Sequence, residues 1–147
     1  DFLRLIKEMQ EHVKQYDISI LDTAAGISRE VTTFLRCAKK IIFVLTPDPT
    51  SMTDAYALLN ILEQQEPGKD IHILVNQTQH EEEGHIIFQK MRKVCQTYLQ
   101  RDVKFIGHVP RDRCVTDAIR SRKPFILNPD SRAAAAIKSI AMRLRNS

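Results

Sequence analysis

We expect the fold of this chain to be organised around residues 16–28, YDISILDTAAGIS. The short apolar run at residues 18–22 predicts a buried strand of a parallel sheet. This strand ends on Asp22, and Thr23, two alanines and Gly26 follow it. Ligands of open α/β sheets bind at the carboxyl ends of strands, where an Asp beside small residues suits a Mg²⁺–phosphate site. Asp22 can equally serve only as the cap of the next helix, and the stretch alone leaves both interpretations open.

The composition is that of an ordinary globular domain. The 147 residues are 43% hydrophobic and 27% charged, which is enough for one domain with a sizeable core. No apolar run approaches the roughly 18 residues of a membrane-spanning helix, and we recognise no signal peptide at the start of the sequence. The three cysteines, Cys37, Cys95 and Cys114, lack CxxC spacing, so we expect reduced thiols in a cytoplasmic protein.

Charge is distributed unevenly along the chain. Residues 1–100 carry 11 Lys and Arg against 14 Asp and Glu, a balance of −3, whereas residues 101–147 carry 11 against 4, a balance of +7. Such a basic third can attract anionic lipid, nucleic acid or nucleotide phosphates. We favour the simpler interpretation of a solvated basic face, because charge alone does not define a site.

The remaining sequence alternates predicted helices and strands. Helices are expected at residues 2–15, 28–38, 51–66 (capped by Ser51), 86–99, from Asp112 onward, and from Asp130 or Ser131 to the end. Strands are expected at residues 18–22, 41–46, 71–75 and 103–109, with an acidic loop at 77–84 and an extended piece at 125–127. This order, with its short connections, predicts a three-layer α/β domain whose mostly parallel sheet is flanked by helices.

Several familiar sites are absent or incomplete in the sequence. The HEEEGH run at residues 80–85 resembles a zinc-binding helix, but its histidines are five apart, whereas ligands on one helical face need a spacing of about four. We therefore do not expect a metal there. The chain also has no GxxxxGK[ST] phosphate loop and no GxGxxG motif. No Ser/His/Asp or Cys/His set can be paired, so we interpret His12, His72 and His108 as structural.

Four segments taken together resemble the MinD/ParA-type (SIMIBI) P-loop ATPases. They are YDISILDTAAGIS, VLTPDPTSMTDAYALLN, LVNQ and FIGHVPRDRCVTDAI, in this order. The combination of DTAAGIS with TPDPTSMTDAY is most similar to the flagellar-number regulator branch, known as FlhG, FleN or YlxH. The resemblance treats residues 1–147 as one partial MinD-like ATPase domain, corresponding to the later portion of the family's domain. The family's phosphate-loop strand, first switch and GTPase-stimulating segment have no counterpart in this sequence.

The resemblance implies a role for the opening stretch. Asp22, with Thr23 to Gly26, matches the family's second switch, in which the Asp bonds a water on Mg²⁺ and the loop senses the γ-phosphate. Asp22 is thus the expected catalytic residue and the indirect metal contact, and Thr23 and Gly26 are expected at the nucleotide. Residues 46–56 match the strand end and helix that face the nucleotide and the dimer partner.

The resemblance also implies a base-binding edge. Asn76 matches the family's adenine-reading Asn, a side chain that can donate and accept hydrogen bonds at once. Pro110, Arg111 and Asp112 match the loop whose backbone lies against the base. The simpler alternatives are a turn residue for Asn76 and a helix cap for Asp112.

The missing phosphate-loop strand would lie between the counterparts of residues 18–22 and 41–46. Three possibilities follow: these two strands pair directly, a second copy fills the gap, or the chain is one piece of a longer protein. A site with Asp22 and Asn76 but no phosphate cradle should bind ATP and Mg²⁺ weakly, because the cradle supplies most phosphate contacts. We therefore expect that the chain alone does not convert ATP and water to ADP and phosphate.

By resemblance, the parent function is an ATP-dependent, dimerising switch that limits or places polar flagella. We expect self-association, and the family's partners are an FlhF-type GTPase, flagellar switch proteins and the inner face of the cell membrane. Two alternatives are a non-enzymatic partner-binding module built on the same fold and a ParA-type partitioning protein that contacts DNA. The TPDPTSMTDAY segment favours the flagellar branch, so nucleic acid is not the expected partner.

The predicted C-terminal helix has a narrow apolar stripe of Ile137, Ile140 and Leu144 beside several cations. It could lie on an anionic membrane, as the helices that end MinD-type proteins do, or pack on the sheet. The stripe is rich in Ala and free of Phe and Trp, so it offers little area to acyl chains. We therefore predict core packing, with any membrane segment beyond Ser147.

Overall fold

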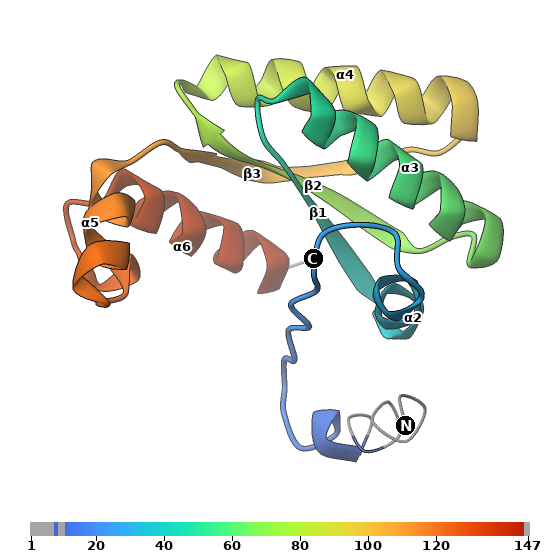
Figure 1. The fold of residues 1–147 in the computed structure, drawn as a ribbon, viewed down its shortest axis with the longest axis horizontal. Coiled ribbons are helices and arrows are strands. Elements are labelled where there is room, and N and C mark those ends of the chain that lie inside the picture. Colours follow the sequence, from blue (N-terminus) through green and yellow to red (C-terminus); the bar gives the residue numbers. More distant parts are fainter. Residues whose placement is uncertain (1–7, 9–10, 146–147) are drawn as a thin grey trace.

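The computed structural model describes residue 8 and residues 11–145, and within them three parallel strands form one sheet. The strands β1 (Lys40–Leu45), β2 (Asp70–Thr78) and β3 (Lys104–Pro110) lie in the order β1-β2-β3. Each is joined to the next through a helix, the connection that parallel neighbours require. The predicted three-layer α/β fold is confirmed, with helices on both sides of the sheet (Figure 1).

One face of the sheet is covered by α3 (Pro49–Gln65) and α4 (Glu81–Leu99), which lie above it in Figure 1. Alternate residues of β1 point into this layer and are buried, as the period of a strand requires. The core on this face consists of Ile41, Phe43, Leu45, Leu59, Leu62, Ile71, Ile73, Val75, Phe88, Met91, Cys95 and Val103.

The opposite face is covered only in part. Here α6 (Arg132–Arg145) packs on β3, and a second core forms from Leu74, Ile106, Val109, Ala133 and Ile140. Beside it, α5 (Arg113–Ser121) and the short 3₁₀ helix η1 (Phe125–Leu127) form a lobe at one end of the molecule (Figure 1). On this same face of the sheet, Ile42 and Val44 of β1 remain exposed.

The predicted core packing of the C-terminal helix is confirmed. Ala133, Ala134 and Ile140 of α6 are buried, and the small side chains let the helix approach the sheet closely. A Cβ atom at Gly107 of β3 would lie 2.9 Å from the Ile140 side chain, and Gly107 has a φ of +145°. Within the described residues, no helix has the length and apolar character needed to cross a bilayer.

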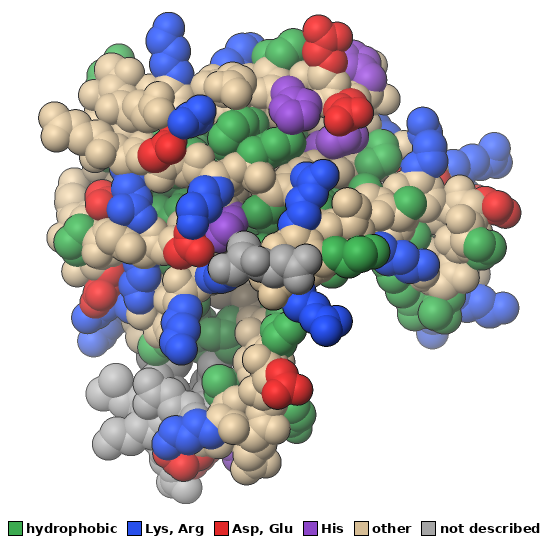
Figure 2. Space-filling model, turned by 180° about the vertical axis from the view of Figure 1, so that it is seen from behind, with side chains coloured by type: hydrophobic (Ala, Val, Ile, Leu, Met, Phe, Trp, Pro, Cys, Tyr) green, Lys and Arg blue, Asp and Glu red, His purple; other side chains and the backbone are tan. Residues whose placement is uncertain are grey.

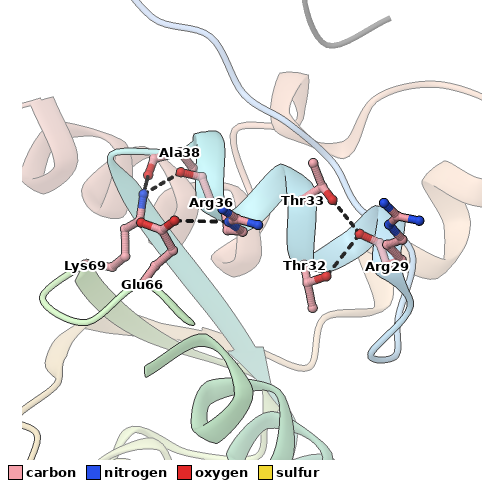
Figure 3. A network of polar contacts seen from close by, with 7 residues as sticks. All are labelled: Arg29, Thr32, Thr33, Arg36, Ala38, Glu66 and Lys69. Atoms are coloured by element: carbon pink, nitrogen blue, oxygen red, sulfur yellow. Dashed lines mark hydrogen bonds and ion pairs between the residues drawn. The ribbon is translucent and has the colours of Figure 1, made fainter. Parts of the chain in front are cut away.

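The helix α2 (Arg29–Cys37) begins after Ser28, which caps it as predicted. Its C-terminal end is fixed by residues of the turn between α3 and β2 (Figure 3). The Lys69 ammonium donates to the carbonyls of Arg36 and Ala38, and Glu66 forms an ion pair with the Arg36 guanidinium at 3.1 Å. This network holds the end of α2 next to the start of β1.

The predicted strand at residues 18–22 is wrong. These residues form irregular coil, and Ile20 is 88% exposed. An apolar run becomes a strand only when a neighbouring strand accepts its backbone hydrogen bonds. In the described part of the chain β1 pairs with β2 alone, so residues 18–22 have no such neighbour. Direct pairing between residues 18–22 and β1, the first of the three possibilities, is contradicted.

The start of α3 also differs from the prediction. Asp48, not Ser51, is the N-cap, and its side chain accepts a hydrogen bond from the Thr50 N–H at 2.9 Å. Pro49 occupies the first helical position, where its fixed φ is favourable and its missing N–H costs nothing.

Two further segments are corrected, and one prediction lies largely outside the described residues. Residues 81–84, predicted as loop, form the first turn of α4, and the His80 ring caps it by accepting the Glu83 N–H at 3.2 Å. Three glutamates in that turn are favourable at the positive end of the helix dipole. Residues 125–127 form a 3₁₀ turn instead of an extended piece. Most of the predicted helix at residues 2–15 falls on undescribed residues.

Candidate functional site

The carboxyl ends of the three strands meet at one edge of the sheet. β1 ends one residue before Thr46, β2 aligns Asn76 with Val109 of β3, and β3 ends at Pro110. Because the strands are parallel, the residues that follow them lie at the same edge. The structure therefore brings together Asn76, Pro110 and the loop at residues 46–48 that leads into α3.

Asn76 is half-buried, and its side chain is oriented by the next residue. The Asn76 Oδ1 accepts a hydrogen bond from the backbone N–H of Gln77 at 2.9 Å. Within the described residues its amide nitrogen has no partner and is available as a donor. Gln77 has a φ of 61°, a left-handed conformation that is uncommon for residues other than Gly. Such strain is frequent beside binding sites. The sequence analysis missed Gln77 because no turn residue marks it.

The loop after β3 is tied to the end of β2. The Arg111 N–H donates to the carbonyl of Thr78 at 2.8 Å. Below this bond the buried Thr78 hydroxyl lies 2.9 Å from Nδ1 of His108. These contacts hold Pro110 and Arg111 against the end of β2, at the edge where Asn76 lies. Their role in binding a base stays a prediction.

Asp112 anchors the starts of two helices. Its Oδ1 accepts the Cys114 N–H at 2.9 Å, and its Oδ2 accepts the Ala133 N–H at 3.0 Å and the Ser131 hydroxyl at 2.8 Å. These donors, the Ala133 N–H first, hold the pKa of the carboxyl far below its usual range. The Ser131 Oγ in turn accepts the Ala134 N–H at 3.1 Å. The side chain of Asp112 therefore acts as a helix cap, the simpler of the two interpretations, and its carbonyl accepts the Val115 N–H at 3.1 Å.

The loop after β1 borders a small pocket. The Thr46 N–H donates to the Ser51 Oγ at 3.1 Å, which folds residues 46–51 back on themselves. The pocket has a volume of about 120 Å³ and lies between this loop and α4. It is lined by Thr46, Pro47, Asp48, Pro49, Met52, Ile87 and Lys90. The sequence analysis named the loop but not Ile87 or Lys90, because nothing local links α4 to the end of β1.

The structure does not bring the second-switch residues to this edge. Asp22 is exposed, Thr23 is half-buried, and both lie in the coil before α2. Gly26 has a φ of +108°, and no atom lies within 4 Å of the position that a Cβ would take. No hydrogen bond or ion pair in the described part of the chain joins Asp22 to Asn76 or Asp112. Their joint role stays a prediction.

The described residues that were predicted to bind ATP concern only one end of the molecule, the base, and their role stays a prediction. Asn76 offers an amide donor at the carboxyl edge, whereas the Arg111 N–H and the Asp112 carbonyl are already hydrogen-bonded to Thr78 and Val115. No described group of three His, Cys, Asp or Glu residues could hold a metal ion. The sequence also has no glycine-rich lysine loop for the phosphates, so the residues present do not fit Mg²⁺–triphosphate.

Comparisons with known proteins identify the family of the chain. The family model for the cellulose biosynthesis protein BcsQ matches residues 2–144. The chain belongs to this family. Among curated relatives of this BcsQ-family chain, the antiactivator FleN of Pseudomonas aeruginosa is 32% identical over 141 residues. That match covers 95% of the chain and 50% of FleN. The flagellum site-determining protein YlxH of Helicobacter pylori is 26% identical over 108 residues, covering 73% of the chain and 36% of YlxH.

The solved structures bear out the fold. The MinD cell division protein of Aquifex aeolicus superposes with a TM-score of 0.82 at 22% identity, covering 100% of this chain and 61% of that one. The predicted resemblance to MinD/ParA-type ATPases is therefore confirmed, as is the MinD-like fold of this BcsQ-family chain. The chain spans about half the length of FleN, with 50% of that protein covered.

Proposed function

We propose that this chain is part of an ATP-dependent, MinD-like switch that regulates the number or placement of flagella. The observation that carries the proposal is the carboxyl edge, where Asn76 presents a free amide donor beside the loop held by the Arg111–Thr78 hydrogen bond. The flagellar assignment is supported by the names of FleN and YlxH and by the TPDPTSMTDAY segment.

The switch requires more than the residues present in this chain. Residues 18–22 are unpaired coil, and one edge of β1 is free in the described structure. A strand placed between them would pair with both segments and would bring Asp22 toward the carboxyl edge. We infer that the phosphate-loop strand of a longer polypeptide, or of a second copy, occupies this position. Alone, the chain is expected to be inactive.

ATP hydrolysis tests this function. The chain alone, with Mg²⁺ and ATP, should release no phosphate, because charge stabilisation of the transferred phosphoryl group is the main catalytic contribution. A longer polypeptide that adds the phosphate-loop strand should hydrolyse ATP, and it should dimerise when ATP is bound. In that polypeptide Asp22→Ala should abolish ATP-dependent dimerisation, and Asn76→Ala should weaken ATP binding. Phosphate release by the chain alone, or unchanged dimerisation in the Asp22→Ala variant, would contradict the proposal.

The partners proposed for the complete switch are a second copy, an FlhF-type GTPase, flagellar switch proteins and the cytoplasmic face of the membrane. A second candidate function is a non-enzymatic module that binds a partner through the start of α3. The pocket at Thr46 and Lys90 favours it, because a concave site next to an exposed loop can accept a side chain of another protein. If a longer polypeptide binds this partner with the same affinity in the presence and absence of ATP, the non-enzymatic module is supported.

A further inference from the structure

The end of β2 has an unusual backbone conformation. The register of β2 and β3 shifts between Asn76 and Thr78, and the residue between them, Gln77, has a φ of 61°. A left-handed conformation is unfavourable for a residue with a side chain, and it persists only where the surrounding contacts enforce it. The Gln77 N–H donates to the Asn76 Oδ1 at 2.9 Å, so this conformation also sets the orientation of the Asn76 amide.

Thr78 supplies contacts that enforce this conformation. The residue is fully buried, and its hydroxyl lies 2.9 Å from the Nδ1 of His108. Its carbonyl accepts the Arg111 N–H at 2.8 Å. The two contacts fix both the side chain and the backbone of Thr78 against β3 and the loop that follows it. The chain therefore cannot straighten at Gln77 unless Thr78 gives up a buried hydrogen bond, which is costly.

A glycine in α4 makes room for the pair of Thr78 and His108. A Cβ atom at Gly84 would lie 2.7 Å from the His108 Cβ and 3.5 Å from the Thr78 Cγ2. Glycine is unfavourable inside a helix, and Gly84 is a buried residue of α4. We therefore attribute the glycine at this position to the close approach of His108.

The imidazole of His108 is half-buried and belongs to neither of the two cores. In the view from behind, histidine side chains reach the surface beside acidic ones at the end of the molecule where α4 begins (Figure 2, top). The contact with Thr78 is thus the buried part of the His108 ring's environment. A substitution at this position can remove that contact without opening either core.

An amide with a fixed orientation distinguishes the two purines. Adenine presents the N6 donor beside the N7 acceptor, whereas guanine presents acceptors at both O6 and N7. Because the Asn76 Oδ1 accepts the Gln77 N–H, the amide cannot turn over without losing that bond. Its oxygen and nitrogen therefore keep their places. Such an amide can pair with adenine through both atoms, whereas its oxygen would face the O6 of guanine.

We propose that Thr78 and His108 are positioning residues that fix the Asn76 amide and thereby set a preference for adenine over guanine. Both act through the backbone of Gln77 and not by contact with the base. This role rests on the proposed function, since it requires a nucleotide base at the carboxyl edge.

Hydrogen exchange of the chain alone tests whether Thr78 holds the end of β2. Thr78→Val keeps the shape of the side chain and removes its hydroxyl. The Gln77 and Arg111 amides should then exchange about fivefold faster, because one hydrogen bond contributes about that factor, and Thr78→Ser should keep the parent rates. The matched control, Ile71→Val, removes one methyl group from the buried start of the same strand and should change neither amide. Unchanged exchange in Thr78→Val would overturn the proposal.

Base preference is tested in the longer polypeptide that adds the phosphate-loop strand, through its dissociation constants for ATP and GTP. The parent should prefer ATP. Thr78→Val and His108→Leu should each lower this preference about tenfold, because a bidentate amide–base pair contributes discrimination of about that size. The double variant should lose no more than either single one, since the two residues share one contact. Thr78→Ser and Ile71→Val should retain the preference, and circular dichroism checks that each variant is folded.

Gly84→Ala offers an independent route to the same result. Alanine is the better helix former, so an effect confined to α4 would only stabilise the helix. The added Cβ must instead displace the His108 ring, which it would approach to 2.7 Å at the Cβ. The variant should therefore lower the preference for ATP, and an unchanged preference would count against the role of His108.

Failure of this role can be told apart from failure of the proposed function. A longer polypeptide that binds neither ATP nor GTP contradicts the proposed function, and the positioning role falls with it. A parent that binds both nucleotides equally, or variants at Thr78 and His108 that keep the parent's preference, would overturn the positioning role alone. Equal losses of affinity for ATP and GTP would do the same, because they would show that the two residues only stabilise the fold.

Discussion

Asp22 and Asp112 are two carboxylates at the ends of apolar runs, and they differ in their environment. Asp112 follows β3, and three donors from two helices converge on it. Asp22 ends residues 18–22, an equally strand-like run, yet it lies exposed in coil. We therefore compare two regions, the leading segment (residues 18–28) and the β3–α6 unit (residues 104–145).

The difference lies in the neighbours that each region has. β3 pairs with β2 and receives α6 on one face, so its backbone and side chains have partners. The leading segment has similar β-propensity but no strand beside it. A strand is thus a property of a pair of segments, and a sequence pattern predicts only one of the two.

The largest expected effect is on the free energy of unfolding when a glycine in each region, Gly107 or Gly26, is replaced by Ala. Gly107→Ala should lower the free energy of unfolding by about 3 kcal/mol, because it adds overpacking against Ile140 to the strain of a positive φ. Gly26→Ala carries only the strain, since its surroundings are open, and should cost about 1 kcal/mol. Urea denaturation of both variants measures the difference. Equal losses would mean that close packing between β3 and α6 contributes nothing.

The second prediction uses the two carboxylates themselves. Asp112→Ala should cost about 2 kcal/mol, because it removes caps from α5 and α6 and leaves the buried Ser131 hydroxyl without its acceptor. Asp22→Ala in the chain alone should stay within about 0.5 kcal/mol of the parent. Chemical denaturation at neutral pH checks both. A loss at Asp22 as large as that at Asp112 would break the comparison, since it would require partners for Asp22 that the structure lacks.

The third prediction concerns pH and the start of β3. The hydrogen bond from Lys104, at 2.6 Å, lowers the pKa of Asp70 from 3.8 to about 2, with a smaller contribution from His72. A lowered folded-state pKa gives stability that is present above pH 3.8 and lost as the pH falls toward 2. Because the Asp70 side chain is 30% exposed, the contribution is about 1 kcal/mol.

The measurement is the difference in unfolding free energy between the parent and Asp70→Asn across this pH window. The difference should shrink toward the acid end, because the parent loses its charged carboxylate there. Other carboxylates titrate in the same range and cancel in the difference. A difference that does not change with pH would exclude Asp70 as a source of acid sensitivity.

The smallest effect is expected at the most exposed residue of the leading segment. Ile20→Asp should change the unfolding free energy of the chain alone by less than about 0.5 kcal/mol, because Ile20 is 88% exposed. In a longer polypeptide that supplies the missing strand, the same substitution should be strongly destabilising, since Ile20 would then be buried. Identical, small effects in both backgrounds would contradict the proposed place of the leading segment in a completed sheet.

Much of the fold could be predicted from sequence because its signals are local. The strand predicted at residues 41–46 has an apolar run from Ile41 to Leu45 and corresponds to β1 (Lys40–Leu45), and Ser28 and Asp112 each cap the helix that follows. The core packing of the C-terminal helix was predicted from its narrow apolar stripe, which is rich in Ala and free of Phe and Trp. These features depend on residues within one or two helical turns, which a linear pattern contains.

The rest depended on contacts between distant segments. The strand prediction in the leading segment was wrong because no strand in the described structure pairs with it. The loop prediction at the start of α4 was wrong because it did not anticipate that His80 caps this helix. At the candidate site, Asn76 and Pro110 were predicted by resemblance. Gln77 has a positive φ where the register of β2 and β3 shifts between Asn76 and Thr78, and Lys90 lines the pocket only because α4 packs beside the end of β1. Such relations arise from tertiary structure and leave no local trace.

The distribution of the three free cysteines has a practical consequence. Cys95 lies in the larger core, and burial raises the pKa of its thiol to about 11, so the native chain protects it from alkylating reagents. Cys37, at the exposed end of α2, has no such protection. A short pulse of iodoacetamide followed by mass spectrometry would thus report, in one sample, the openings of the core at Cys95 against the freely labelled Cys37. The alkylation rate of Cys95 therefore measures how often the core opens. If another strand completes the sheet, we expect Cys95 to be alkylated more slowly.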